Sequence, residues 1–113
     1  MQIKSQNLIN DIKGMWVCID SKNHANEEHL GLEFSLLISE NLMSRIGSEN
    51  KFWPRICNFE SVGSSQDGYF YREDGTFIQV KSVDNDFLKL ELSAKDENGK
   101  LQMTTFIFEK FEN

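Results

Sequence analysis

The chain has 113 residues, which is the size of one ordinary domain and too few for two cores of normal depth. Twelve Lys and Arg against 18 Asp and Glu give a net charge of −6, and the sequence pI is about 4.8. Nucleic acid and membrane surfaces are anionic, so this acidic balance argues against both as partners. We expect a single domain over residues 1–113 that binds neither nucleic acid nor a membrane.

The N-terminus lacks the features of a secretory signal. Residues 1–14 alternate polar and apolar side chains, and no stretch of the chain approaches the length of a membrane span. We therefore expect a cytoplasmic protein. Cys18 and Cys57 are the only thiols and belong to no C-x-x-C pair, which favours two buried free cysteines over a zinc site or a disulfide.

The first predicted element is a short helix. Leu8, Ile9 and Ile12 have the spacing of one helix face. Ser5 before them is a typical N-cap, and Gly14 after them is a typical stop. Such a short helix is unstable alone, so we expect it to lie across the mouth or edge of a larger structure.

Three further segments follow in order. Residues 15–20 (MWVCID) predict a strand that is apolar on both faces and therefore well covered. Residues 21–29 are polar and without periodicity, which predicts an exposed loop. Residues 30–39 carry apolar side chains at every second position, the pattern of a half-buried antiparallel strand.

The segment after Ser39 allows two interpretations. The spacing of Leu42, Met43 and Ile46, followed by Gly47, fits a helix of one to two turns. A continuation of the preceding strand competes with it.

The second half of the chain consists of short runs rich in aromatic and β-branched residues, which are typical of strands. These runs are residues 52–59, 69–72, 76–83, 87–94 and 101–111. Turn signals separate them, including Asp74-Gly75 and Asn98-Gly99, which suit tight hairpins. Pro54 cannot donate to a ladder and predicts an edge or a bulge.

These elements predict a closed fold. An open sheet of so many strands would leave two edges unpaired, whereas a barrel has none. Connections of hairpin length favour up-and-down order. We therefore predict an all-β, mainly antiparallel, up-and-down β-barrel of about seven or eight short strands with a short N-terminal helix, whose interior is either filled or wide enough for one small ligand.

The start of the chain resembles a known family. A short helix followed by Gly14-Met15-Trp16 is similar to the G-x-W signature of lipocalin-like (calycin) barrels, in which the Trp plugs the closed end. The hairpin at Asp74-Gly75 and the final run 105–108 resemble small bacterial lipocalin-like domains. Lipocalins tend to carry a late Arg that packs on the Trp, and the nearest residue here is Lys110, which lacks the planar guanidinium. The resemblance assigns structural roles to Gly14, Trp16 and Lys110, and implies binding of small apolar molecules or a protein, usually without catalysis.

No residue set in the sequence points to catalysis. His24, Glu27, Glu28 and His29 share one polar loop, but their spacing is not H-E-x-x-H and no strong third cluster follows, so we expect a solvated loop and no metal site. The chain has no Gly-rich phosphate loop and no G-x-S-x-G motif. We expect no catalytic residues, no cofactor and no enzymatic activity.

Two binding hypotheses remain. In the first, a lipocalin-like barrel holds a small hydrophobic ligand in its mouth, lined by Phe34, Leu36, Trp53 and Tyr71, which requires a hollow of about 300 Å³ or more. In the second, an acidic protein neutralises a basic protein through its outer surface, as immunity proteins do with toxins. The second hypothesis predicts carboxylates grouped on one face beside exposed aromatic side chains.

Overall fold

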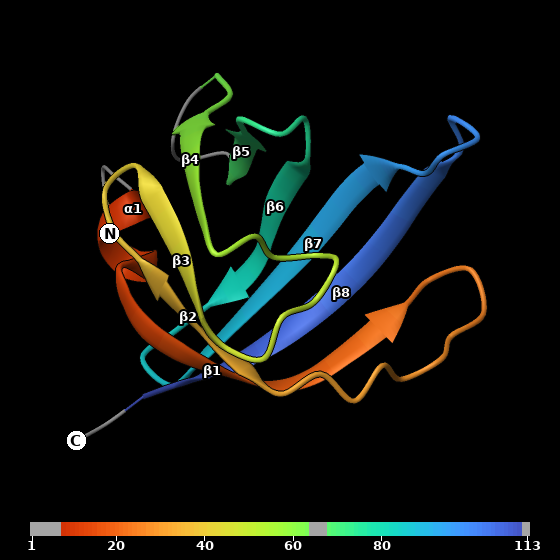
Figure 1. The fold of residues 1–113 in the computed structure, drawn as a ribbon. Helices are drawn as coiled ribbons and strands as arrows, with labels where there is room; N and C mark the ends of the chain where they lie inside the picture. The colour runs from red at the N-terminus through yellow and green to blue at the C-terminus, as the bar shows by residue number, and fades with distance from the viewer. Residues whose placement is uncertain (1–7, 64–67, 112–113) are drawn as a thin grey trace, which may run out of the picture.

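The computed structural model describes residues 8–63 and 68–111, and these form a closed antiparallel barrel (Figure 1). Its elements are α1 (Leu8–Ile12), β1 (Gly14–Asn23), β2 (Phe34–Ile38), β3 (Leu42–Gly47), β4 (Ile56–Ser61), β5 (Tyr69–Arg72), β6 (Phe77–Val83), β7 (Phe87–Lys95) and β8 (Leu101–Lys110). Each strand pairs with the next, and β8 returns to β1. The predicted all-β, up-and-down barrel with a short N-terminal helix is confirmed, while the predicted N-cap Ser5 lies outside the described residues.

β1 is longer than predicted. It pairs with the ten-residue β8 from Trp16 opposite Lys110 to Asn23 opposite Thr104, so the expected loop 21–29 begins only after Asn23. Trp16 and Cys18 face the interior, but Ile19 is 51% exposed. The prediction that both faces of this strand are covered was wrong, because a barrel strand has one face on the core and one on solvent.

The predicted strand 30–39 contains the shorter β2. Phe34, Leu36 and Ile38 are buried, which confirms the alternation. The helix considered after Ser39 is wrong, because the chain turns there, with the Ser39 N–H donating to the Leu42 carbonyl at 2.9 Å, and returns as β3. Pairing with β2 from Met43 to Gly47 outweighs a local spacing that also fits a helix turn.

The second half matches the predicted strands closely. β5 has the predicted bounds, and β6, β7 and β8 differ from them by one residue at one end. The run 52–59 becomes a strand only from Ile56, because Pro54 lies in the connection before it.

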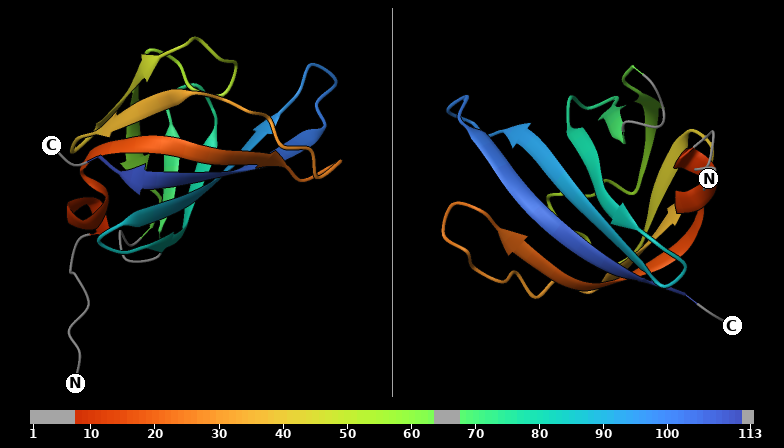
Figure 2. Two further views of the ribbon diagram at one scale, coloured as in Figure 1. Left: turned by 90° about the horizontal axis from the view of Figure 1, so that it is seen from below. Right: turned by 180° about the vertical axis from the view of Figure 1, so that it is seen from behind.

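The core fills the barrel along its length. α1 lies at the end where β1 begins (Figure 2), and Ile12 there is fully buried. Rings inside the barrel meet edge to face, as where Phe34 and Phe108 have centroids 5.8 Å apart. No helix in residues 8–63 and 68–111 is both long and apolar enough to cross a bilayer.

Candidate functional site

Trp16 closes the α1 end of the barrel. Its indole Nε1 donates to the Ile12 carbonyl at 2.8 Å, which ties the strand to the helix. The Lys110 ammonium lies 4.6 Å from the centre of the Trp16 ring, a distance that allows cation–π attraction. The same ammonium donates to the Lys13 carbonyl at 3.0 Å. A cation from the last strand therefore covers the indole, although it is an ammonium and not a guanidinium.

Gly14 lies against the same Lys110 ammonium. Its φ of +122° is a conformation that side chains with a Cβ rarely adopt. A Cβ at this position would also run into the Lys110 ammonium. The structure thus brings Gly14, Trp16 and Lys110 together at the plugged end.

The four residues predicted to line a ligand site do not share one surface. Phe34, Leu36 and Trp53 lie inside the barrel and are at most 5% exposed. Tyr71 lies on the outer wall, 38% exposed, with its ring edge-on to Phe77 at a centroid distance of 4.9 Å. Alternation along a strand shows which residues share a face, but it does not show which face is inside.

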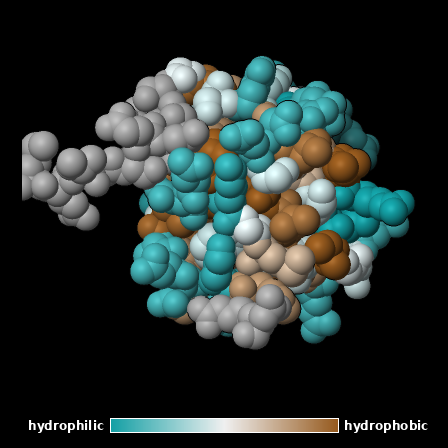
Figure 3. All heavy atoms as spheres, turned by 90° about the vertical axis from the view of Figure 1, so that its left-hand side faces the viewer, coloured by the Kyte–Doolittle hydropathy of each residue, from teal (hydrophilic) through white to brown (hydrophobic). Residues whose placement is uncertain are grey.

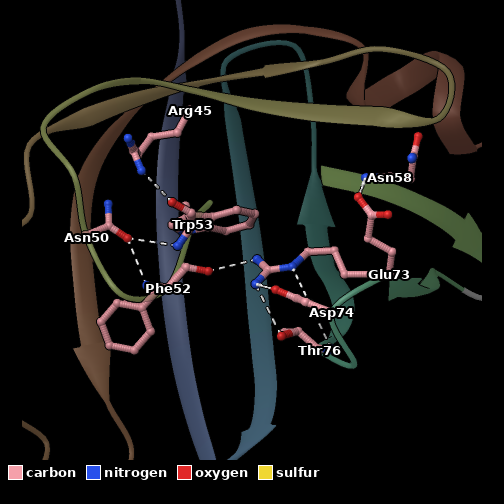
Figure 4. A network of polar contacts seen from close by, with 9 residues as sticks. Arg45, Asn50, Phe52, Trp53, Asn58, Glu73, Asp74 and Thr76 are labelled. Carbon is pink, nitrogen blue, oxygen red and sulfur yellow. Dashed lines mark hydrogen bonds and ion pairs between the residues drawn. The ribbon is translucent and has the colours of Figure 1, made fainter. Parts of the chain in front are cut away.

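The connection between β3 and β4, residues 48–55, covers the second end of the barrel. It inserts Trp53 among the core rings, 5.5 Å from Phe106 between centroids. The Asn50 side chain accepts hydrogen bonds from the backbone N–H groups of Phe52 and Trp53, and Arg45 donates to the Trp53 carbonyl at 2.9 Å (Figure 4). These bonds fix the segment across the mouth.

Arg72 on β5 holds segment 48–55 in place. It is only 3% exposed and donates to the Phe52 carbonyl at 2.8 Å, while its guanidinium lies 5.3 Å from the centre of the Trp53 ring. It also makes a two-point ion pair with Asp74 and a hydrogen bond to Thr76 (Figure 4). Sequence analysis missed this residue, although the alternation in residues 69–72 (YFYR) already placed it on the same face as the core residue Phe70.

Little space remains at the covered mouth. A cavity of about 70 Å³ lies beside Arg72, with Phe52 and Thr104 among its lining residues. Pockets for small molecules are usually about 300 to 1,000 Å³, so this cavity is too small for a ligand while segment 48–55 is in place.

An acidic and aromatic surface lies on the outside of β4, β5 and β6. We define the β4–β6 surface as Glu60, Tyr71, Glu73 and Phe77. In the strand register Tyr71 is opposite Glu60 on one side and opposite Phe77 on the other. A hollow of about 300 Å³ lies here, and its lining residues are Asn58, Phe59, Glu60, Tyr71, Arg72 and Glu73. Carboxylates and exposed aromatic rings therefore stand side by side here.

Glu73 of this hollow and its chain neighbour Asp74 stay ionised at neutral pH. A hydrogen bond from the Asn58 N–H, at 2.9 Å, lowers the pKa of Glu73. Burial alone raises the pKa of Asp74, but the hydrogen bonds and charge of Arg72 outweigh it and hold the pKa below its ordinary value. Other carboxylates, such as Asp84 and Asp96, accept backbone hydrogen bonds within their own turns.

Apolar side chains are exposed on the neighbouring outer wall. Leu37 on β2, Ile46 on β3 and Ile56 on β4 are each at least 39% exposed. Figure 3, which views the side at the left of Figure 1, shows apolar side chains gathered next to polar ones. Several exposed apolar side chains on neighbouring strands are typical of contact surfaces.

The two histidines lie on the outer wall near the β1–β2 loop. His24 Nε2 contacts the Thr105 hydroxyl and lies 3.7 Å from Glu91, whereas His29 Nδ1 lies 2.8 Å from Asp20. Each imidazole thus has its own carboxylate. Within the described part of the chain, no cluster of three or more His, Cys, Asp or Glu side chains is arranged to hold a metal ion.

The two cysteines are buried and free, as predicted. Desolvation by burial raises the pKa of Cys18 to about 11. A thiol in this state is a poor nucleophile at neutral pH.

No protein-family model matches the chain, and no curated protein matches its sequence. The class of protein therefore rests on the architecture itself, which is a closed eight-stranded up-and-down barrel.

Proposed function

We propose that the protein is a non-enzymatic binding protein that recognises a basic protein through the β4–β6 surface, in the manner of an acidic immunity or inhibitor protein. The supporting observation is the hollow of about 300 Å³ that Glu60 and Glu73 line, next to exposed Tyr71 and Phe77. Arg72 also lines this hollow, but it is buried and already paired with Asp74. We further propose that the barrel belongs with the lipocalin-like proteins, on the strength of its N-terminal helix, its G-x-W start and the cation over Trp16.

A Lys or Arg side chain from a partner matches this hollow. Its aliphatic stem would pack on Tyr71, and its charged end would reach Glu60 and Glu73. Charge-assisted hydrogen bonds of this kind are about twice as strong as neutral ones. The net charge of −6 would also speed encounter with a basic partner and make it sensitive to salt.

The other hypothesis, a small hydrophobic ligand inside the barrel, has less support. Phe34, Leu36 and Trp53 already pack against other core residues, and the cavity at the mouth holds about 70 Å³. A ligand would have to displace segment 48–55 and break the bond between Arg72 and the Phe52 carbonyl. Ligand binding by the barrel stays a prediction, tested by small-molecule extraction from the purified protein.

The proposal is tested by charge reversal at matched positions. Glu60→Lys changes the β4–β6 surface, whereas Glu97→Lys makes the same change of charge in the exposed β7–β8 turn. Proteins retained by the immobilised wild type are identified by mass spectrometry, and the retained protein is purified and titrated by calorimetry. We expect a basic protein whose affinity falls about 30-fold or more with Glu60→Lys, which corresponds to about 2 kcal/mol.

The control decides the interpretation. Glu97→Lys is expected to change the affinity less than about threefold, because it lies outside the contact. Equal loss with both variants would show that only net charge matters and would overturn the proposed surface. Retention of a neutral or acidic protein that Glu60→Lys does not affect would overturn the proposal as well.

A further inference from the structure

A polar groove lies on the outside of the barrel across β6, β7, β8 and β1, and has a volume of about 580 Å³. It is separate from the β4–β6 surface. Two β-bulges border it, one between Cys18 and Asp20 in β1 and one between Val80 and Ser82 in β6. Bulges bend strands and re-aim side chains, and they are frequent next to functional sites. The long strands β1, β7 and β8 run together through this part of the wall (Figure 2).

The floor of the groove contains a carboxylate that is buried although it faces outward. Glu91 alternates with the core residues Leu90 and Leu92, so its side chain is on the outer wall, yet it is only 9% exposed. It is opposite Thr105 in the register, and His24 contacts both residues. A buried Glu is uncommon unless it is paired, and here His24 is its partner. A ligand in the groove would therefore meet the Glu91 carboxylate, the Thr105 hydroxyl and the His24 imidazole.

Two lysines from β6 and β7 also line the groove. Lys81 is the extra residue of the β6 bulge, and Lys89 lies on β7 opposite Ser82. Among the described residues, neither ammonium is paired with a carboxylate, and the Lys81 ammonium contacts only the Gln79 amide oxygen at 3.5 Å. Lys22, by contrast, is paired with Glu27. The carboxylates of Asp20, Glu27 and Glu91 also line the groove, but each already has a basic partner. Lys81 and Lys89 therefore remain to attract an anion.

We propose that this groove binds a small polyhydroxylated anion, a sugar phosphate or a sugar acid. The anionic group would lie between Lys81 and Lys89, as ammonium groups favour phosphate and carboxylate oxygens. Hydroxyl groups of the sugar would donate to Glu91 and accept from Thr105, since a carboxylate only accepts and a hydroxyl does both. Ile107 provides an apolar surface for the sugar ring. The site uses none of the residues of the β4–β6 surface, so this proposal is independent of the proposed protein partner.

The test is an NMR titration of the full chain labelled with ¹⁵N, at low salt. The probes are glucose 6-phosphate, glucuronate, glucose and inorganic phosphate. We expect the two anionic sugars to shift the amide signals of residues in β6, β7 and β8 around Lys81, Lys89 and Thr105. Glucose and inorganic phosphate should each bind at least about tenfold more weakly, because each lacks one half of the contacts. Stronger binding of one anionic sugar identifies which anionic group the site prefers.

Three variants separate the roles of the groove residues. Lys89→Gln is expected to weaken the anionic sugar about tenfold, whereas Lys95→Gln, which removes the same charge from an exposed position further along β7, should leave the affinity unchanged. Glu91→Gln should weaken the sugars but not inorganic phosphate. If Glu91→Gln does not fold, Thr105→Val tests the same contact.

Three outcomes would overturn the inference. The first is the absence of saturable shifts in the groove with either anionic sugar. The second is equal weakening by Lys89→Gln and Lys95→Gln, which would indicate nonspecific attraction. The third is equal affinity for inorganic phosphate and the sugars, which would show that the hydroxyl contacts play no part.

Discussion

Replacing Arg72 by Met should destabilise the protein substantially, because Arg72 holds segment 48–55 in the mouth of the barrel. Met keeps much of the apolar length of the side chain and leaves the ring of Trp53 covered, so the change mainly removes the guanidinium. That group is 3% exposed and donates to the Phe52 carbonyl, to Thr76 and to Asp74.

The expected loss is about 3 kcal/mol. The Phe52 carbonyl loses a charged donor inside the protein, which costs about 1.5 to 3 kcal/mol. The ion pair adds only about 1 kcal/mol, because the Asp74 side chain is 40% exposed and solvent screens it. For a domain of this size, a loss of about 3 kcal/mol lowers Tm by roughly 12 °C.

The assay is urea denaturation followed by far-UV circular dichroism and Trp fluorescence. The matched control is Arg55→Met, since Arg55 is exposed and its side chain makes no polar contact with the described residues. Its free energy of unfolding should change by less than about 0.5 kcal/mol. A loss below about 1 kcal/mol for Arg72→Met, or an equal loss for Arg55→Met, would refute the reasoning.

Three further predictions concern the plugged end, the buried thiol and acid stability. Gly14→Ala should lower the free energy of unfolding by about 1 to 3 kcal/mol in thermal denaturation. The loss should be smaller in a Lys110→Ala background, where the new Cβ no longer collides with the Lys110 ammonium. An unchanged loss would show that backbone strain alone is responsible. Cys18 should resist alkylation at pH 8 in the native state and react in urea, because burial raises its pKa to about 11; fast native labelling would contradict its burial. Arg72 keeps the pKa of Asp74 below its ordinary 3.8, so the stability from this carboxylate is present above pH 3.8 and lost as the pH falls through the lowered value. Asp74→Asn should therefore make the free energy of unfolding fall less steeply at acid pH. An unchanged dependence on pH would contradict this.

The strands were predictable where burial imposes a period of two. The alternation from Phe34 to Ile38 and the runs of the second half became strands because one side of each faces the core. The segment after Ser39 was mispredicted, since the spacing of Leu42, Met43 and Ile46 fits a helix turn, and the competing prediction was a continuation of the preceding strand. Pairing with β2 decides the outcome, and pairing is not a local property of the sequence.

The sites were less predictable because they depend on segments that meet only in three dimensions. No local pattern signals that residues 48–55 fold into the mouth and place Trp53 in the core. The loop residues His24 and His29 were grouped in the sequence, but Glu91 and Lys89 of the groove come from a strand far along the chain. The bulges that shape the groove are register shifts, which the side-chain pattern does not reveal.

The pairing of β1 with β8 has a consequence for how the chain reaches its native state. Trp16 pairs with Lys110, so the seam of the barrel joins segments from nearly opposite ends of the chain. Phe106 and Phe108, at the centre of the ring cluster, also come from this last strand. During synthesis the growing chain would carry unpaired edges on β1 and β7 until β8 has left the ribosome. Because such long-range closure slows folding and exposes edges meanwhile, we expect this interval to be when the protein is most open to aggregation and to chaperones.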